Sequence, residues 1–542
     1  MPTPPRRPDP PPGKVLIEAA RIVTLDPAQP EATALAVAGG RVVGAGRRED
    51  FDTWRDADTR VVRVAQGAVY PGFVESHAHL MAMGRQMERL YVGSPPCRSV
   101  ADVLARVRDA AARTPPGEWI VGMHYDDTLL EERRPPTAAE LNAAAPAHPV
   151  YLSHMSGHLA VASEMALARA AVTEATDVPG VMRDGAGRLT GELREAAAMH
   201  LVSRLLPKAG RADRVRWLER ASAWCLARGV TSMCDSNFGS ADADDTAVSW
   251  QAYLEADDAR TLLVRTQVFP SLAARAHLPQ SRDQGFVSVG PVKLFADGSI
   301  QGHTGALRDG YFDQPEERGR LFWQQCELVE TLATLRAEGR QVATHANGDA
   351  AIDLVLDAYE AALGEGRAAD HRWRIEHAQM ARLDQVRRMA DLGVLPSFFL
   401  NHVEVFGDRH RDLFLGPERA ANISPARWAQ GLGVVFSLHS DAPVTPPEPL
   451  RSIATAVSRR TSSGAVLGPD QAVDPDVALR AYTSWAAWLG RREAAVGSLK
   501  PGAWADAVVL DRALDAGSGV EERWVTGVLQ HGVPVDVVSL PS

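Results

Sequence analysis

The chain has 542 residues, of which 45% are hydrophobic and 23% are charged, which is enough for a large barrel enzyme with a smaller second domain. Its 58 basic and 68 acidic residues give a formal net charge of −10, which argues against nucleic acid or an anionic membrane as the main partner. The charge says nothing positive about the substrate. We expect a small-molecule substrate, no nucleic-acid or membrane partner, and a homodimer as one candidate assembly.

The N-terminus is rich in proline and has no apolar core, so it indicates neither a secretion signal nor a membrane anchor. We expect residues 1–12 to form a disordered tail. The four cysteines form no CxxC pair and are too few for a disulfide framework in so long a chain. A reducing, cytoplasmic location is the simplest interpretation.

Short β-like runs separated by turn residues begin at Lys14 and recur near the C-terminus. Hairpins this short rarely stand alone. We therefore favour one small β-sandwich built from both chain ends, residues 13–71 and 493–542, over two unrelated β-caps.

The middle of the chain, residues 72–492, alternates strand-like runs with helix-like stretches, which favours βα units around a parallel sheet. The candidate strands lie at 72–79, 229–235, 262–269, 291–298, 340–348, 372–378, 393–399 and 433–441. Eight strands is the number in a TIM barrel, so we predict an α/β fold of the (β/α)8 barrel type.

The first two strand candidates are separated by roughly 150 residues, far beyond a normal crossover. This gap contains a further strand-like run at 149–154. We interpret residues 85–200 as an inserted subdomain over the barrel mouth. Counting 149–154 as a barrel strand would instead give nine strands.

Histidines and one aspartate lie where several of these strand candidates end. His77 and His79 share one face of a strand, because side chains i and i+2 point the same way. His345, His377 and Asp441 close three later strands, and in a TIM barrel such ends meet at the face that carries the active site. One such histidine would more often be an ordinary core residue, but imidazoles with a carboxylate are a catalytic zinc ligand set. Together they predict a divalent metal site.

Lys293 lies between apolar neighbours on the fourth strand candidate, where a lysine is rarely buried unless it is paired or modified. Its amine could reach water or pair with Asp297. Alternatively, the amine could add CO₂, which would give a carbamate that bridges two metal ions. The residues alone leave these alternatives open.

The runs VYPGFVESHAHL, PVKLFADGSI, THANGD, IEHAQ and SDAPV occur in this order and resemble the amidohydrolase superfamily. GHLAVAS and VGSLKPGAWADAVVLD resemble its amidohydrolase 3, or YtcJ-like, branch. The resemblance covers nearly the whole chain after residue 14. It implies a distorted TIM barrel, one or two divalent ions with zinc as the first candidate, and a carbamylated lysine. The ligands that it implies are His77, His79, Lys293, His345, His377 and Asp441.

The match departs from the family pattern at positions that bear on the substrate. Glu75 stands where an aspartate is usual, and His303 follows the DGS motif where many relatives differ. The resemblance suggests that Tyr125 and His158 line the pocket, although ordinary loop polar residues would look the same. Asp297 and His303 are further candidate substrate contacts.

These features predict hydrolysis of a C–N bond in an amide-like substrate by metal-activated water, with Asp441 as the catalytic acid–base group. N-substituted formamides are one substrate class among relatives. One alternative is a deaminase of a ring amine that uses a single ion and an unmodified Lys293. The other is a metal-stabilised binding or regulatory protein without turnover.

Overall fold

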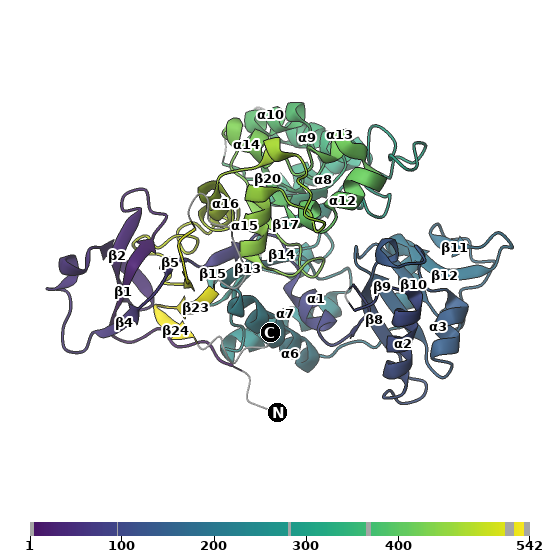
Figure 1. Cartoon of the computed structure of the whole chain (residues 1–542), viewed down its shortest axis with the longest axis horizontal. Coiled ribbons are helices and arrows are strands. Elements are labelled where there is room, and N and C mark those ends of the chain that lie inside the picture. The colour runs from purple at the N-terminus through teal and green to yellow at the C-terminus, as the bar shows by residue number, and fades with distance from the viewer. Residues whose placement is uncertain (1–4, 95, 280–282, 365–369, 515–524, 536–542) are drawn as a thin grey trace. The chain divides into compact units, whose positions relative to one another are not determined.

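The computed structural model describes residues 5–94, 96–279, 283–364, 370–514 and 525–535. Contacts divide the chain into two compact units, one formed by Met1–Gly84 with Arg211–Ser542 and one formed by Arg85–Gly210. Each unit has its own sheets and its own buried core (Figure 1). Part of the predicted N-terminal tail, residues 1–4, lies outside the described residues, as does the end of the last predicted β-run.

Parallel strands form the centre of the larger unit. Within the described residues they are β6 (Phe73–Glu75), β13 (Val230–Phe238), β14 (Arg265–Pro270), β17 (Val292–Phe295), β18 (Val342–Ala346), β19 (Arg374–His377), β20 (Leu395–Phe399) and β21 (Ser437–His439). Each overlaps one of the eight predicted runs, so the predicted α/β barrel is confirmed. Strands such as β18 are buried along their whole length, as expected for parallel strands that are covered on both faces.

The barrel strands fall into two sheets. One has the order β15-β16-β14-β13-β6, where β15 is Asp283–Gln284 and β16 is Val287–Val289, and the other has the order β17-β18-β19-β20-β21. A parallel bridge between Ser271 and Lys293 joins them on one side. On the other side the Asp441 N–H donates to the His77 carbonyl at 3.1 Å. The barrel is therefore distorted at two junctions, and both junctions involve predicted metal ligands.

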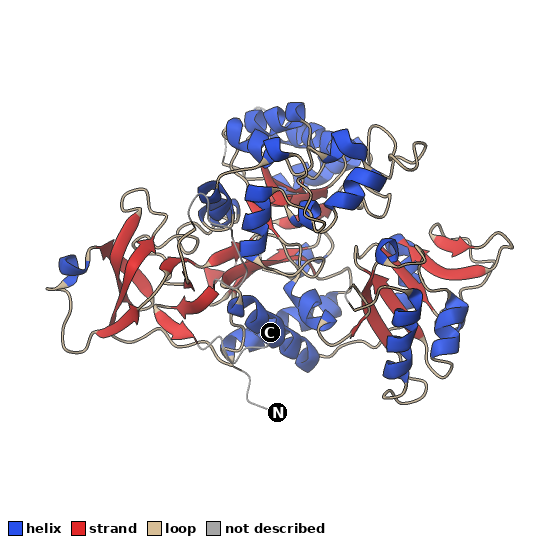
Figure 2. Cartoon of the chain, in the orientation of Figure 1, coloured by secondary structure: helices blue, strands red, loops and turns tan. Residues whose placement is uncertain are grey.

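Helices follow most of these strands (Figure 2). They are α1 (Leu80–Gln86), α6 (Arg211–Ala227), α7 (Ala243–Asp258), α8 (Gln325–Ala337), α9 (Asp349–Leu363), α10 (Leu383–Leu392), α11 (Asn401–Glu404), α12 (Gly407–Arg409), α13 (Gly416–Ala420), α14 (Ala426–Gly431), α15 (Pro449–Ser458), α16 (Pro475–Ala481) and α17 (Ser484–Leu489). Helix α10 shows why they form: Val386, Met389 and Leu392 recur at helical spacing and are buried, and Gly393 ends the helix with φ 67°. No helix among the described residues is both long enough and apolar enough to cross a membrane.

Strands from both ends of the chain form one mixed sheet with the order β24-β23-β22-β5-β1-β2-β3, and β4 pairs with β1. The strands are β1 (Lys14–Val23), β2 (Glu31–Ala38), β3 (Arg41–Gly46), β4 (Arg60–Val64), β5 (Ala68–Pro71), β22 (Ala507–Leu510), β23 (Val525–Gln530) and β24 (Val533–Val535). Figure 1 shows the purple strands beside the yellow ones, and β5 pairs antiparallel with β22. A layered sandwich stays a prediction.

A buried ion pair joins this sheet to the barrel. The Arg265 guanidinium, in β14, donates through Nε to Asp506 Oδ2 at 2.7 Å, and its Nη2 lies 2.9 Å from His531 Nε2. Arg7, from the predicted tail, donates to Asp257 Oδ1 at 2.6 Å and lies over the ring of Phe286. The described part of the tail therefore contacts the barrel.

The smaller unit has a sheet with the order β11-β12-β10-β9-β8-β7. Its elements are β7 (Leu90–Tyr91), α2 (Val100–Ala111), β8 (Ile120–Tyr125), α3 (Ala138–Ala144), β9 (Val150–His154), β10 (Leu159–Ala162), α4 (Glu164–Arg169), β11 (Val181–Arg183), β12 (Leu189–Arg194) and α5 (Glu195–Ser203). The run at 149–154 forms β9, which pairs with β8 and β10. It is therefore not a ninth barrel strand.

Candidate metal centre

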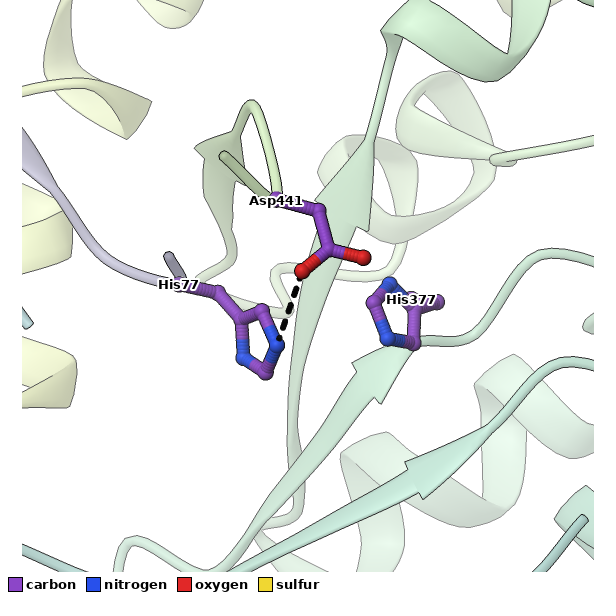
Figure 3. Close-up of side chains that lie close together, drawn as sticks. All are labelled: His77, His377 and Asp441. Carbon is purple, nitrogen blue, oxygen red and sulfur yellow. Dashed lines mark ion pairs between the residues drawn. The ribbon is translucent and has the colours of Figure 1, made fainter. Parts of the chain in front are cut away.

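Most of the predicted ligands come from the carboxyl ends of barrel strands. His77 and His79 follow β6, and Asp441 follows β21, while His377 is the last residue of β19. Figure 3 shows the Asp441 carboxylate with His77 on one side and His377 on the other. His77, His377 and Asp441 each offer one ligand atom, and these atoms all lie within 4.8 Å of one another. The barrel brings together residues that are far apart in sequence.

The spacing of the polar atoms suits an ion. Asp441 Oδ1 lies 3.4 Å from His77 Nε2 and 3.2 Å from His79 Nε2, and Lys293 Nζ lies 3.4 Å from His77 Nε2. Ligand atoms about 2.1 Å from a tetrahedral zinc ion are about 3.4 Å apart. Asp441 Oδ1 is also buried without a hydrogen-bond partner among the described residues, a state that costs about 1–3 kcal/mol unless something binds there. The donor set therefore fits a divalent metal ion.

The rings of His77 and His79 are held through their other nitrogen. His77 Nδ1 lies 2.6 Å from Glu376 Oε2, and His79 Nδ1 lies 2.7 Å from the Ser236 carbonyl oxygen. Arg374 in turn holds Glu376, with its Nε 2.8 Å from Oε1. Each Nδ1 has an acceptor oxygen within 2.7 Å, which favours a proton on Nδ1 and leaves each Nε2 with its lone pair toward Asp441. Metal-binding histidines are commonly oriented in this way.

Burial adjusts the charges of the centre. It holds the pKa of His77 well below its ordinary value, with Lys293 adding to the effect, and it does the same for the pKa of His377, with His345 adding. These rings are therefore neutral at pH 7, as metal ligation requires. Burial also lowers the pKa of Lys293 from 10.5 to about 8, although Glu376 and Asp441 oppose the shift. More of the Lys293 amine is therefore neutral near pH 7 than in an ordinary lysine.

Two residues of the centre have unusual backbone angles. His377 has φ 69° and Asp441 has φ 53°, both in the left-handed region that side chains other than glycine rarely adopt. Each such residue costs about 1–3 kcal/mol and persists where surrounding structure holds it, which is common at functional sites. The strain therefore falls on residues that we expect to do chemistry.

His345 is adjacent to the group but is oriented differently. Its ring centroid lies 4.6 Å from that of His377, while its Nε2 lies 3.0 Å from the Gly298 carbonyl oxygen and 3.1 Å from Asn347 Nδ2. A proton on Nε2 faces the carbonyl oxygen. In this pose His345 would bind an ion through Nδ1.

Two of the predicted substrate contacts in the larger unit make internal contacts. The buried Asp297 carboxylate accepts three backbone N–H hydrogen bonds at 2.8–2.9 Å, so it organises the loops after β17 and β18. His303 Nε2 lies 3.0 Å from Asp313 Oδ2. Contact of either residue with substrate stays a prediction.

The other two predicted substrate contacts lie in the smaller unit. Tyr125 is 1% exposed and belongs to the core of that unit. His158 is partly exposed, with its Nδ1 3.1 Å from Glu195 Oε2. Their predicted place in a substrate pocket is untested.

A second cluster of possible ligands, Asp126, Asp127 and His154, lies in the smaller unit. His154 Nε2 is 3.4 Å from Asp127 Oδ1 and 3.8 Å from Asp126 Oδ1. The Ser156 N–H donates to His154 Nδ1 at 3.0 Å, so a neutral ring carries its proton on Nε2. The ring thus turns an N–H toward the carboxylates, which favours an ion-pair-like contact over a metal site.

Sequence reasoning missed Glu376 and Arg374, which orient His77. The signal was available: a buried strand with an arginine and a glutamate two residues apart places both on one face. His439 was likewise not among the predicted site residues. Its Nε2 lies 3.1 Å from His377 Nδ1.

Comparison with known proteins agrees with this geometry. The family model described as "Amidohydrolase family" matches residues 60–534. The chain is 31% identical over 514 residues to Protein LONG AFTER FAR-RED 3 of Arabidopsis thaliana, covering 92% of this chain and 87% of that protein. It is 30% identical over 550 residues to the N-substituted formamide deformylase of Arthrobacter pascens, covering 95% of this chain and 98% of that protein.

Further similarity extends to YtcJ of Bacillus subtilis (strain 168), with 26% identity over 493 residues that cover 88% of this chain and 90% of YtcJ. The crystal structure of an uncharacterized metal-dependent hydrolase from Pyrococcus horikoshii superposes with a TM-score of 0.74 at 25% identity, covering 93% of this chain and 98% of that one. With a family match over most of its length, the chain belongs to the amidohydrolase family, in its YtcJ-like branch.

Proposed function

We propose that this protein is a metal-dependent hydrolase that cleaves the C–N bond of an amide-like substrate. One observation carries the proposal: the buried Asp441 Oδ1 lies within 3.4 Å of Nε2 of both His77 and His79, whose Nδ1 atoms face acceptors. The similarity to a metal-dependent hydrolase and to a formamide deformylase supports it. Zinc is the first candidate ion, because the donors are imidazole and carboxylate.

The residues of the centre would have different roles in the reaction. An ion held by His77, His79 and Asp441 would supply an activated water and polarise the substrate carbonyl. The Asp441 carboxylate takes the proton of the attacking water and passes it to the leaving nitrogen, so that the C–N bond breaks to give an acid and an amine. Glu376 and Ser236 keep the two imidazoles in the orientation that this requires.

The substrate class can be tested with a panel. Metal-replete protein would be incubated with N-substituted formamides, other N-acyl amines and ring amines, and the released acid, amine and ammonia would be measured. We expect turnover of amides, with N-substituted formamides first. Release of ammonia from a ring amine alone would favour the deaminase alternative. A stable metal complex that turns over none of these compounds would favour the regulatory alternative.

The state of Lys293 decides whether the centre holds two ions or one. We propose that its neutral amine adds CO₂, because burial lowers its pKa to about 8 and leaves unprotonated amine near neutral pH. The carbamate would turn Lys293 into an anionic ligand, with which the centre could hold a second ion. Bicarbonate during metal reconstitution should therefore raise activity, and Lys293→Ala should bind fewer ions and turn over slowly.

The exposed Lys208 provides the matched control, and Lys208→Ala should respond to bicarbonate as the wild type does. A short carboxylic acid added to Lys293→Ala should restore part of the activity, because it can replace the missing carboxylate. An electron-density map with an unmodified Lys293 amine beside one fully occupied ion would rule out the carbamate.

A further inference from the structure

Next to the candidate centre lies a buried chain of polar side chains that the proposed mechanism does not use. Its members are His439, Ser397, Ser437 and Ser76, which are 0–4% exposed. His439 lies between the three serines and the centre: its Nε2 is 3.1 Å from His377 Nδ1, and its Nδ1 is 2.9 Å from Ser397 Oγ. Both nitrogens of the His439 ring are thus engaged, one on each side.

We propose that His439, held by Ser397, is a positioning residue that sets the tautomer of His377 and leaves the Nε2 lone pair of His377 available to the metal ion. The inference rests on the proposed function, since it concerns the same centre. It assigns to His439 a role in metal affinity and none in the acid–base step.

The first step follows from counting ring protons. Both rings are buried and lie 3.1 Å apart, where two charged imidazoliums would repel each other, so each ring is neutral and carries one N–H. One of the two rings must donate across their 3.1 Å contact. If His439 donates, the proton of His377 sits on Nε2 and blocks ligation. If His377 donates through Nδ1, its Nε2 keeps a lone pair that can bind the ion.

The serines decide which ring donates. Among the described residues, Ser76 Oγ contacts the Leu438 carbonyl oxygen at 3.1 Å, Ser437 Oγ at 2.9 Å and Ser397 Oγ at 3.2 Å, and Ser437 Oγ contacts Ser397 Oγ at 2.8 Å. With the His439 contact, five contacts share three hydroxyl hydrogens. If Ser397 donated to His439, only two hydrogens would remain for the other four contacts.

The arrangement that satisfies more of these buried groups has His439 donating through Nδ1 to Ser397 Oγ. Ser397 can then donate to Ser76, Ser76 to the Leu438 carbonyl oxygen, and Ser437 to Ser397. His439 Nε2 is left as an acceptor, and His377 Nδ1 donates to it. The hydrogen bonds that lead from His377 to the Leu438 carbonyl oxygen therefore all donate in the same direction.

The test is metal affinity, measured by competition dialysis against a chelator on the full-length protein. His439→Leu and His439→Asn should weaken binding by about 10–100-fold, the usual effect of losing a group that orients a ligand. His439→Gln should bind within a few-fold of wild type, because its amide oxygen reaches the place of Nε2 and can accept from His377. Asn places its amide near Nδ1 instead. Ser397→Ala should fall between these variants.

His410→Leu is the matched control, because His410 is also 0% exposed and its Nε2 contacts Gln379 Nε2 at 3.2 Å and not a predicted ligand. Equal affinity in His439→Leu and His410→Leu, with wild type binding normally, would overturn this inference and leave the proposed function standing. If His439→Leu does not fold, the Gln and Asn variants decide, since equal affinity in these two also overturns it. A wild type that binds no ion would instead defeat the proposed function and the inference together.

Discussion

Asp441→Asn is expected to lower kcat by about 10²–10⁴, the range for a lost acid–base group. The amide keeps the shape of the carboxylate but cannot take a proton from water. It still offers an oxygen to the position that Asp441 Oδ1 occupies, 3.2 Å from His79 Nε2, so most of the metal should remain bound. The measurement is kcat at pH 7 on the best substrate of the amide panel, with metal content determined on the same sample.

The control for Asp441→Asn is Asp470→Asn, which makes the same chemical change at an exposed position. Its kcat should equal that of the wild type. An Asp441→Asn variant that retains metal and wild-type kcat would exclude the acid–base role. A variant that loses its metal would show that Asp441 acts mainly as a ligand.

Removal of the metal should abolish turnover, and zinc, manganese or cobalt should restore it. His77→Ala should lose metal and activity together, because His77 Nε2 contacts both Asp441 and Lys293 and the group has few spare ligands. Metal content and turnover would be measured after chelation, after reconstitution and in the variant.

His277→Ala serves as the comparison for His77→Ala, since His277 is exposed and remote in sequence from the predicted ligands. It should keep its metal and its activity. Full activity with unchanged metal content in His77→Ala would instead mean that β6 does not contribute to the centre.

The strands and most of the candidate ligands could be predicted from sequence because barrel strands are buried runs that end on polar residues. His77, His377 and Asp441 each stand at such an end, and the fold brings these ends together. The division of the strands into two sheets could not be predicted, because it depends on register at the bridge between Ser271 and Lys293.

The residues that orient the ligands were harder to foresee than the ligands. Glu376 reaches His77 from a different strand, and no spacing in the sequence records a 2.6 Å contact between them. The orientation of the His345 ring likewise depends on its side-chain rotamer and on its contact with the Gly298 carbonyl oxygen. Sequence patterns identify which strand ends converge, whereas tautomers and rotamers follow from three-dimensional packing.

The pairing of β5 with β22 can form only late in translation, because the two strands lie near opposite ends of the polypeptide. Pro71 must wait for Ala507, its partner in the sheet, to be synthesised. At about 5–20 residues per second this delay is roughly 20–90 s. Until then, the edge of β5 that pairs with β22 would be open to other strands. The nascent protein therefore has an aggregation-prone interval during translation, when holding chaperones would be of most use.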